Sequence, residues 1–302
     1  VGVLQRAPFM VLTLIAAAAA IAGLIIARRR GQALFAPGMW RVLVIGLPIF
    51  LIAGAMEPSQ WDEFSHWLPA PNYLLEMNGF PNAEKPDNGA QMLPAYPYGW
   101  PILSYLAGRI AGYQLLNIGG ILNMAMLLTF TPFALRTVMD VIGRPMGPTI
   151  GWGLAAVCGL AATILNPTFV QKIVLTAYSG VSTSVVTGFC ALLTFHFLQS
   201  LGGRNRTAPW PAAWHLALAL ALLINLRQTN LVVFLVILFA LLLLSIRAPE
   251  LSLRRLSVFL PLIIGPALVV YIAWRLYVGA ELSAQAGWEA NFKPLELWNI
   301  KE

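Results

Sequence analysis

The amino-acid sequence predicts an all-α protein that crosses a membrane several times. Of its 302 residues, 59% are hydrophobic and only 10% are charged, and the mean hydropathy is +0.74. Soluble globular domains carry about 25% charged residues, so this composition excludes that class. The apolar residues are also gathered in long runs, and roughly 20 of them in a helix cross a hydrocarbon core about 30 Å thick. We therefore expect a polytopic membrane protein.

The apolar runs predict about eight transmembrane helices. These runs lie at residues 8–27, 40–56, 114–136, 148–166, 178–200, 212–226, 230–246 and 256–278. A cleaved signal peptide carries its basic residues before the apolar core, whereas the strong basic cluster here, Arg28–Arg30, follows the first run. The first run is therefore predicted to remain as a membrane helix.

Arginines lie in every second loop between these runs. They are Arg28, Arg29, Arg30, Arg41, Arg136, Arg144, Arg204, Arg206, Arg247, Arg254 and Arg255. The positive-inside rule places such loops in the cytoplasm, so the alternate loops face the exterior. We expect a protein of the inner (cell) membrane whose loop 57–100 lies on the periplasmic side. Because the topology explains the net charge of +7, we predict no nucleic-acid partner.

The chain is predicted to have three regions. Residues 1–39 form an extra N-terminal helix with an arginine-rich cytoplasmic loop, and residues 40–278 form the membrane core. Residues 279–302 form a second external segment that ends without a polar tail, so a further domain after it is left open.

The external loop 57–100 holds half of the 12 acidic residues. They are Glu57, Asp62, Glu63, Glu76, Glu84 and Asp87. On a helix, Asp62 and His66 share a face, whereas the neighbours Asp62 and Glu63 diverge and should have different roles. A carboxylate beside an imidazole can accept a proton from a hydroxyl, or hold a ligand or a metal ion. This pattern favours a reactive site.

Aromatic residues flank these acids at Trp61, Phe64 and Trp67. Indoles are favoured at membrane interfaces, so we predict an amphipathic helix that lies flat at the headgroup level. An alternative interpretation is that these residues serve only as interface anchors. The functional interpretation is favoured because ionisable groups near a membrane are costly unless they serve a purpose.

No resident metal is predicted. Cys158 and Cys190 lie inside predicted helices, which offers neither a disulfide framework nor a four-ligand metal site. A divalent cation at the loop carboxylates is left open.

Two motifs of the loop carry a resemblance to a known family. The segment Trp61-Asp62-Glu63-Phe64-Ser65-His66-Trp67 resembles the Asp-Glu loop of the GT-C superfamily, and most of all its protein O-mannosyltransferase type and related bacterial members. These are integral membrane glycosyltransferases that use polyprenyl-phosphate sugars. About thirty residues later, Tyr96-Pro97-Tyr98-Gly99 is similar to the Tyr-Pro-Pro-Gly segment that closes the same loop, with Tyr98 in place of the second proline.

The resemblance implies a role for each of several residues. Asp62 would be the general base that deprotonates the acceptor hydroxyl, and Glu63 and His66 would position the acceptor or the donor. Arg227 and Lys172 would bind the donor phosphate, since a guanidinium or an ammonium can neutralise the charge that the leaving group gains. For Lys172, snorkelling to the interface explains the residue equally well. The aromatic residues expected at the substrate are Trp61, Trp67, Tyr96 and Tyr98.

The expected partners are a polyprenyl-phosphate sugar, membrane lipids and an acceptor that is a lipid, a glycan or a protein. One departure concerns Tyr178-Ser179-Gly180, where related sequences often carry an acid, so a second acidic site is not expected. The rival function is a non-catalytic structural subunit of a membrane complex, or a transporter, with a glycosyltransferase-like fold. A transporter should carry ionisable residues at mid-membrane, and the predicted spans are nearly free of charge.

Overall fold

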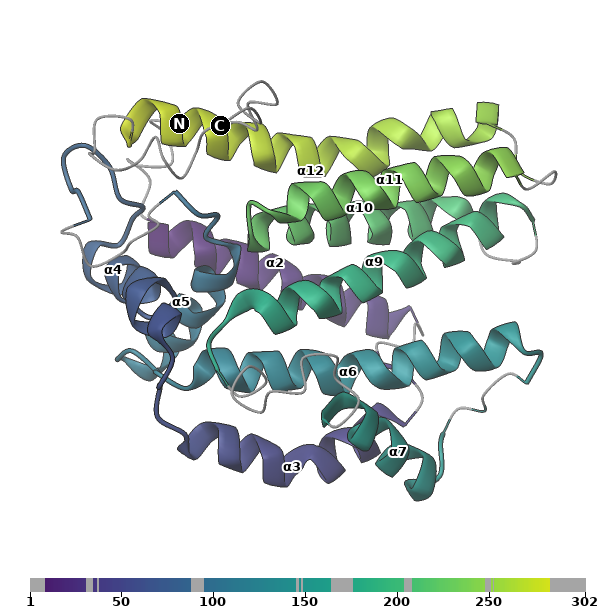
Figure 1. Ribbon diagram of the computed structural model, residues 1–302, viewed down its shortest axis with the longest axis horizontal. Helices are drawn as coiled ribbons and strands as arrows, with labels where there is room; N and C mark the ends of the chain where they lie inside the picture. Colours follow the sequence, from purple (N-terminus) through teal and green to yellow (C-terminus); the bar gives the residue numbers. More distant parts are fainter. Residues whose placement is uncertain are drawn as a thin grey trace, which may run out of the picture.

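The computed structural model describes residues 9–30, 35–36, 38–87, 95–144, 147, 149–163, 176–203, 208–247, 251 and 253–282. All regular secondary structure within these residues is helical (Figure 1). The elements are α2 (Phe9–Arg29), α3 (Met39–Ala55), the π-helix η1 (Glu63–Trp67), α4 (Pro69–Met77), α5 (Gly99–Ala111), α6 (Ile118–Val141), α7 (Trp152–Thr163), α9 (Ser179–Leu201), α10 (Pro209–Leu226), α11 (Asn230–Arg247) and α12 (Leu253–Glu281). The predicted all-helical fold class is confirmed for this part of the chain.

Six of these helices are long and apolar enough to cross a membrane. They are α2, α6, α9, α10, α11 and α12. Two shorter apolar helices accompany them: α3 has 17 residues and α7 has 12. At 1.5 Å per residue, α3 is roughly 25 Å long and α7 roughly 18 Å, both less than a hydrocarbon core of about 30 Å. The chain is therefore a helical membrane protein, and the number of about eight spans stays a prediction.

Large apolar side chains cover much of the outer surface. On α11, for example, Val232, Leu235, Val236 and Phe239 are all more than half exposed. Soluble monomers rarely expose contiguous apolar surface on this scale, whereas lipid tails solvate it without cost. The exposed helix faces therefore fit a protein whose solvent is the bilayer core.

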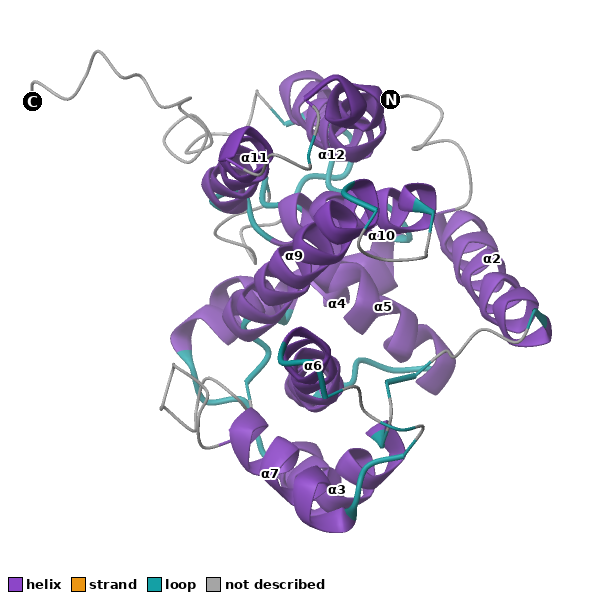
Figure 2. Ribbon diagram, turned by 90° about the vertical axis from the view of Figure 1, so that its right-hand side faces the viewer, coloured by secondary structure: helices purple, strands orange, loops and turns teal. Residues whose placement is uncertain are grey.

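The bundle has two packed groups of helices, seen end-on in Figure 2. In one group α10 lies between α9 and α12, and its residues Leu216, Leu220 and Leu223 are fully buried. In the other group α3, α6 and α7 pack around Met124 and Leu128. Helix α6 also contacts α9, which joins the two groups into one bundle.

Helix α2 stands apart from both groups (Figure 2). Phe9 is its one buried residue, and the Phe9 ring meets the rings of Phe80 and Tyr105 at centroid distances of 4.9 and 5.3 Å. The N-terminal end of α2 is thus attached to the loop region, and the rest of the helix exposes its side chains.

One end of the bundle carries η1, α4, α5 and the irregular segment 79–87, and we call it the polar end (Figure 1). Helix α12 holds it from one side: Trp274 Nε1 donates to the carbonyl of Ala95, and Tyr277 Oη donates to the carbonyl of Pro81, both at 2.8 Å. Helices α6 and α11 end at the opposite end; Arg247 lies in the last turn of α11, and Arg136 lies in the C-terminal part of α6. The structure therefore separates these arginines from the acidic loop, and the compartment that each end faces stays a prediction.

Candidate functional site

A short segment at the start of α9, Thr176–Tyr178, is held by side chains from three other elements. Ala177 N donates to Glu63 Oε1, and Trp100 Nε1 donates to the Ala177 carbonyl, both at 2.8 Å. Asn123 Nδ2 donates to the carbonyls of Thr176 and Tyr178 at 3.0 and 2.7 Å. We call Glu63, Trp100 and Asn123 with this segment the Ala177 clamp. It fixes the position of the chain that leads into α9.

Helix α6 approaches the clamp so closely that only a glycine fits there. A Cβ atom built on Gly119 would lie 2.6 Å from Ala177 Cα, far inside van der Waals contact. The absence of a side chain at Gly119 lets the backbone of α6 reach the segment that Asn123 holds. The clamp therefore depends on backbone contact as well as on hydrogen bonds.

Glu63 is the centre of this clamp rather than an open carboxylate. Only 3% of its surface is exposed, and its Oε2 accepts hydrogen bonds from the backbone N–H groups of Ser59 and Gln60 at 2.8 and 2.9 Å. With Ala177, three backbone donors satisfy the carboxylate, which is how proteins accommodate a buried anion. Glu63 thus ties the turn before η1 to the start of α9.

Asp62, the residue before it, has different surroundings. It is half-buried and lies close to Tyr178, the residue just before α9. Burial, followed by the interaction with Asp62, raises the pKa of the Tyr178 phenol. Tyr178 therefore joins the site, although no role was predicted for it from the sequence. The signal was present as a tyrosine at the outer start of a predicted helix.

His66 lies on the buried side of η1, with 2% of its surface exposed. Its ring packs edge-on against Trp67 and Tyr96 at centroid distances of 4.5 and 5.2 Å. Neither ring nitrogen has a hydrogen-bond partner among the described residues. Burial and, to a smaller extent, the charge of Arg227 lower the pKa of His66 to about 4, so the imidazole is neutral at physiological pH.

Arg227 follows α10 directly, in an extended conformation. Its Nε atom is buried and has no hydrogen-bond partner among the described residues, and no described carboxylate pairs with it. Leaving a buried donor unpaired costs about 1–3 kcal/mol, and more when the group is charged. Arg227 lies close enough to His66 for its charge to affect the imidazole, and both residues have buried nitrogen atoms without partners among the described residues. An anionic ligand between them would supply the missing hydrogen-bond acceptors.

The π-helix itself sets which of these groups face inward. Leu68 N donates to the Glu63 carbonyl at 2.8 Å, a bond that spans five residues instead of four. Such wide turns occur mostly as single insertions in helices, often at functional sites. Here the turn buries Glu63, His66 and Trp67 and leaves Trp61 and Phe64 on the outside.

The other predicted residues lie at different distances from this site. Tyr96 contacts His66, and Trp67 packs inside the apolar core with Trp100. Tyr98 is buried in an aromatic cluster with Phe80 and Trp274, away from His66, and Trp61 is 73% exposed. Lys172 lies outside the described residues. The structure thus brings His66 together with Tyr96 and Arg227, and it places Tyr178 close to Asp62.

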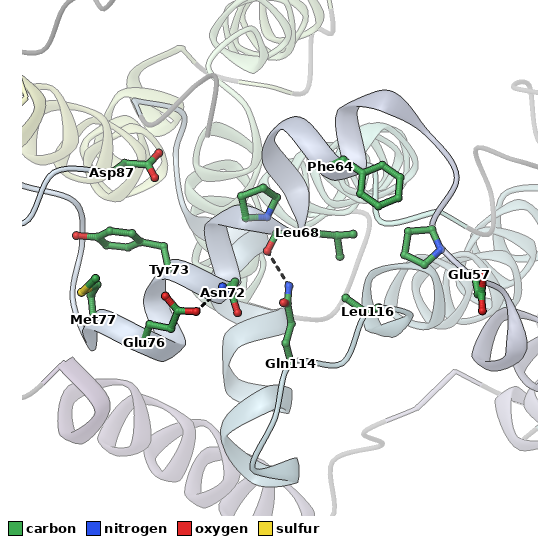
Figure 3. A pocket seen from close by; sticks show the side chains of 12 residues that line it. Glu57, Phe64, Leu68, Asn72, Tyr73, Glu76, Met77, Asp87, Gln114 and Leu116 are labelled. Carbon is green, nitrogen blue, oxygen red and sulfur yellow. Dashed lines mark hydrogen bonds between the residues drawn. The ribbon is translucent and has the colours of Figure 1, made fainter. Parts of the chain in front are cut away.

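A cavity of about 580 Å³ lies on the other side of η1, between α4 and the segment that precedes α6 (Figure 3). Its polar lining consists of Glu57, Asn72, Glu76, Asp87 and Gln114, and the aromatic residues Phe64 and Tyr73 contribute to its wall. Half of the acidic residues that the sequence gathers in this loop line the cavity, but the sequence did not show that they share one. Within the described residues, no group of three His, Cys, Asp or Glu side chains could hold a metal ion.

No protein-family model, curated protein or solved structure matches the chain. From its own fold and site, the chain is a helical membrane protein with a polar site at one end of its bundle.

Proposed function

We propose that the chain is a membrane glycosyltransferase of GT-C type. It transfers a sugar from a polyprenyl-phosphate donor to an acceptor hydroxyl at the polar end, which faces the periplasm. In this proposal about eight helices span the inner membrane, and the lipid carrier lies between them.

One observation carries the proposal: the buried Nε atom of Arg227 and both ring nitrogens of the buried, neutral His66 lack hydrogen-bond partners among the described residues. Arg227 supplies positive charge where a donor phosphate would bind, and His66 supplies a ring nitrogen that can donate a hydrogen bond. Asp62 belongs to the same helical turn as His66 and stays accessible enough to meet a hydroxyl. The Asp-Glu and Tyr-Pro-x-Gly motifs border this site, and their resemblance to motifs of the GT-C superfamily also supports the proposal.

The reaction is a single displacement. The acceptor oxygen gives its proton to the Asp62 carboxylate and forms a bond to the anomeric carbon of the sugar. The bond from that carbon to the phosphate oxygen breaks, and its electron pair leaves with the polyprenyl phosphate. Arg227 neutralises the charge that the phosphate gains, and the configuration at the anomeric carbon is inverted. Glu63 acts through the backbone: it holds the turn that carries Asp62 against the segment that carries Tyr178.

The test is transfer of labelled sugar from a membrane polyprenyl-phosphate pool by the purified protein in nanodiscs. We expect Asp62→Asn to lose at least a hundredfold in rate, within the range of a removed general base. Glu84→Gln removes an exposed acid of the same loop that does not line the site, and it should transfer at the wild-type rate. Arg227→Lys keeps the charge but loses the fork geometry, and a raised KM for the donor is expected.

The rival function predicts a different result. A structural subunit would transfer nothing from any donor pool, and it would copurify stably with other membrane proteins. Transfer that survives in Asp62→Asn would also overturn the assignment of the base. Equal thermal stability of wild type and Asp62→Asn is required, so that lost transfer is not lost folding.

A further inference from the structure

The cavity on the outer side of η1 has a lining of opposite character to the site on the bundle side, with carboxylates in place of Arg227. It is walled by α4, by the turn before η1 and by the segment 114–116. Its volume of about 580 Å³ lies within the range of about 300–1,000 Å³ typical of small-molecule sites. Phe64, two residues after Asp62, belongs to its wall, whereas Glu63 and His66 on the same π-helix face the bundle. The two sites thus share η1 as a common wall.

Hydrogen bonds fix the amide groups in this cavity. Asn72 Nδ2 donates to Glu76 Oε1, and Gln114 Nε2 donates to the carbonyl of Leu68, both at 2.7 Å (Figure 3). A carboxylate and a carbonyl only accept, so these bonds decide which amide atom is nitrogen. The amide oxygens of Asn72 and Gln114 remain as acceptors for a ligand.

The charged groups of the lining are carboxylates. Glu57, Glu76 and Asp87 contribute them from three segments of the polar end, and none of the described residues that line the cavity is Lys, Arg or His. Tyr73 adds no charge, because burial and the nearby Asp87 raise its pKa to about 12, and its hydroxyl donates to the Lys85 carbonyl. A lining rich in acceptors and negative charge repels phosphate and favours hydroxyl or amino groups.

We infer that this cavity binds a carbohydrate without negative charge, whose hydroxyl or amino groups donate to the carboxylates and amide oxygens of Glu57, Asn72, Glu76 and Gln114. The apolar wall suits the C–H face of a sugar ring, with Phe64 and Leu68 on one side and Met77 on another. With the reacting hydroxyl at Asp62, the cavity would hold another part of a glycan acceptor, and this role rests on the proposed function. As a binding site, it stands without any transfer.

The inference is tested by protection of a cysteine placed in the cavity wall. Leu116→Cys puts a thiol at an exposed position of the lining, while the native Cys158 and Cys190 are buried. The rate of maleimide labelling is measured in nanodiscs with glucose, glucosamine or glucuronate, three probes that share one ring and differ in charge. We expect several-fold protection by glucosamine, weaker protection by glucose and none by glucuronate.

Matched variants then locate the effect. Glu76→Gln in the Leu116→Cys background should reduce protection by glucosamine several-fold, and Glu84→Gln, outside the lining, should leave it unchanged. Absence of protection by glucose and glucosamine overturns the inference, as does equal protection by glucuronate. Protection by a lysine-rich peptide in place of the sugars would also overturn it and assign the cavity to a cationic peptide.

These readouts separate the two proposals. If sugars protect the thiol but the wild type transfers no labelled sugar, the sugar site is supported and the transferase proposal is wrong. If the wild type transfers sugar but no sugar protects the thiol, the transferase proposal is supported and the sugar site is wrong.

Discussion

The two sides of the π-helix η1 differ in almost every physical respect. On the bundle side, Glu63 and His66 are nearly inaccessible, and Glu63 is fixed by three backbone donors. On the outer side, Phe64 is 57% exposed and borders a cavity in which two of the three acids, Glu57 and Glu76, are exposed. One short turn therefore supplies both a rigid, partly unsatisfied interior and an open, acceptor-rich surface.

The difference shows that residue type alone does not define a site. Glu63 and Glu76 are the same amino acid in the same loop, but one satisfies buried backbone groups and the other faces a cavity. A buried carboxylate with several donors is costly to remove, whereas an exposed one contributes little to stability. If this difference is real, changes on the bundle side of η1 should lower the free energy of unfolding far more than changes on the outer side.

The largest effect on stability is expected for Glu63→Ala. This change leaves the buried N–H group of Ala177 and the part-buried N–H groups of Ser59 and Gln60 without their charged acceptor; an unpaired buried group costs about 1–3 kcal/mol, and more when its partner was charged. We expect the free energy of unfolding, measured by SDS titration in mixed micelles, to fall by about 3 kcal/mol or more. Glu76→Ala, on the cavity side, should change it by no more than about 0.5 kcal/mol. Equal losses in the two variants would contradict the contrast between the two sides.

A pH-dependent effect of similar size is expected from His66. Its pKa is lowered to about 4 in the folded protein, against about 6.5 when unfolded, so the unfolded chain binds the proton first as the pH falls. Stability is therefore fully present above about pH 6.5 and is lost progressively down to about pH 4, by an amount on the order of 3 kcal/mol.

Unfolding of wild type and His66→Leu across this pH range measures that contribution. The wild type should lose stability relative to His66→Leu as the pH falls, because only the wild type must bury a group that protonates. His215→Leu, which removes an exposed histidine of α10, should follow the wild type. A parallel pH dependence in wild type and His66→Leu would show that His66 is not held neutral.

The long apolar elements were predictable from the sequence. The runs 230–246 and 178–200 became α11 (Asn230–Arg247) and α9 (Ser179–Leu201), because an apolar stretch of that length in lipid satisfies its backbone only as a helix. The run 148–166 corresponds to a shorter helix, Trp152–Thr163, among the described residues. Apolar composition does not determine where such a helix begins.

The candidate site was predictable only in part. The carboxylates, His66 and Arg227 were visible as polar residues where the sequence is otherwise apolar. The Ala177 clamp was not visible, since its acceptor, its indole donor and its backbone partner are separated by up to 114 residues. The inward direction of His66 depends on a π-turn, whose spacing differs from the α-helical spacing on which the sequence argument relied.

The smallest of the expected effects concerns Trp100, whose ring would be largely kept in Trp100→Phe while its N–H donor is lost. The buried Ala177 carbonyl then has no indole partner, and we expect a loss of about 1–2 kcal/mol in the free energy of unfolding. Trp274→Phe is a matched control, because its indole donates at the same 2.8 Å to a carbonyl, that of Ala95, in a part-buried setting that water can reach. A smaller loss is expected in Trp274→Phe, because water can donate a hydrogen bond to the Ala95 carbonyl once the indole N–H is gone. Equal losses would mean that water reaches the Ala177 clamp as readily as it reaches the outer loop. Water would then also hydrogen-bond to the ring nitrogens of His66, and no ligand would be needed to complete them.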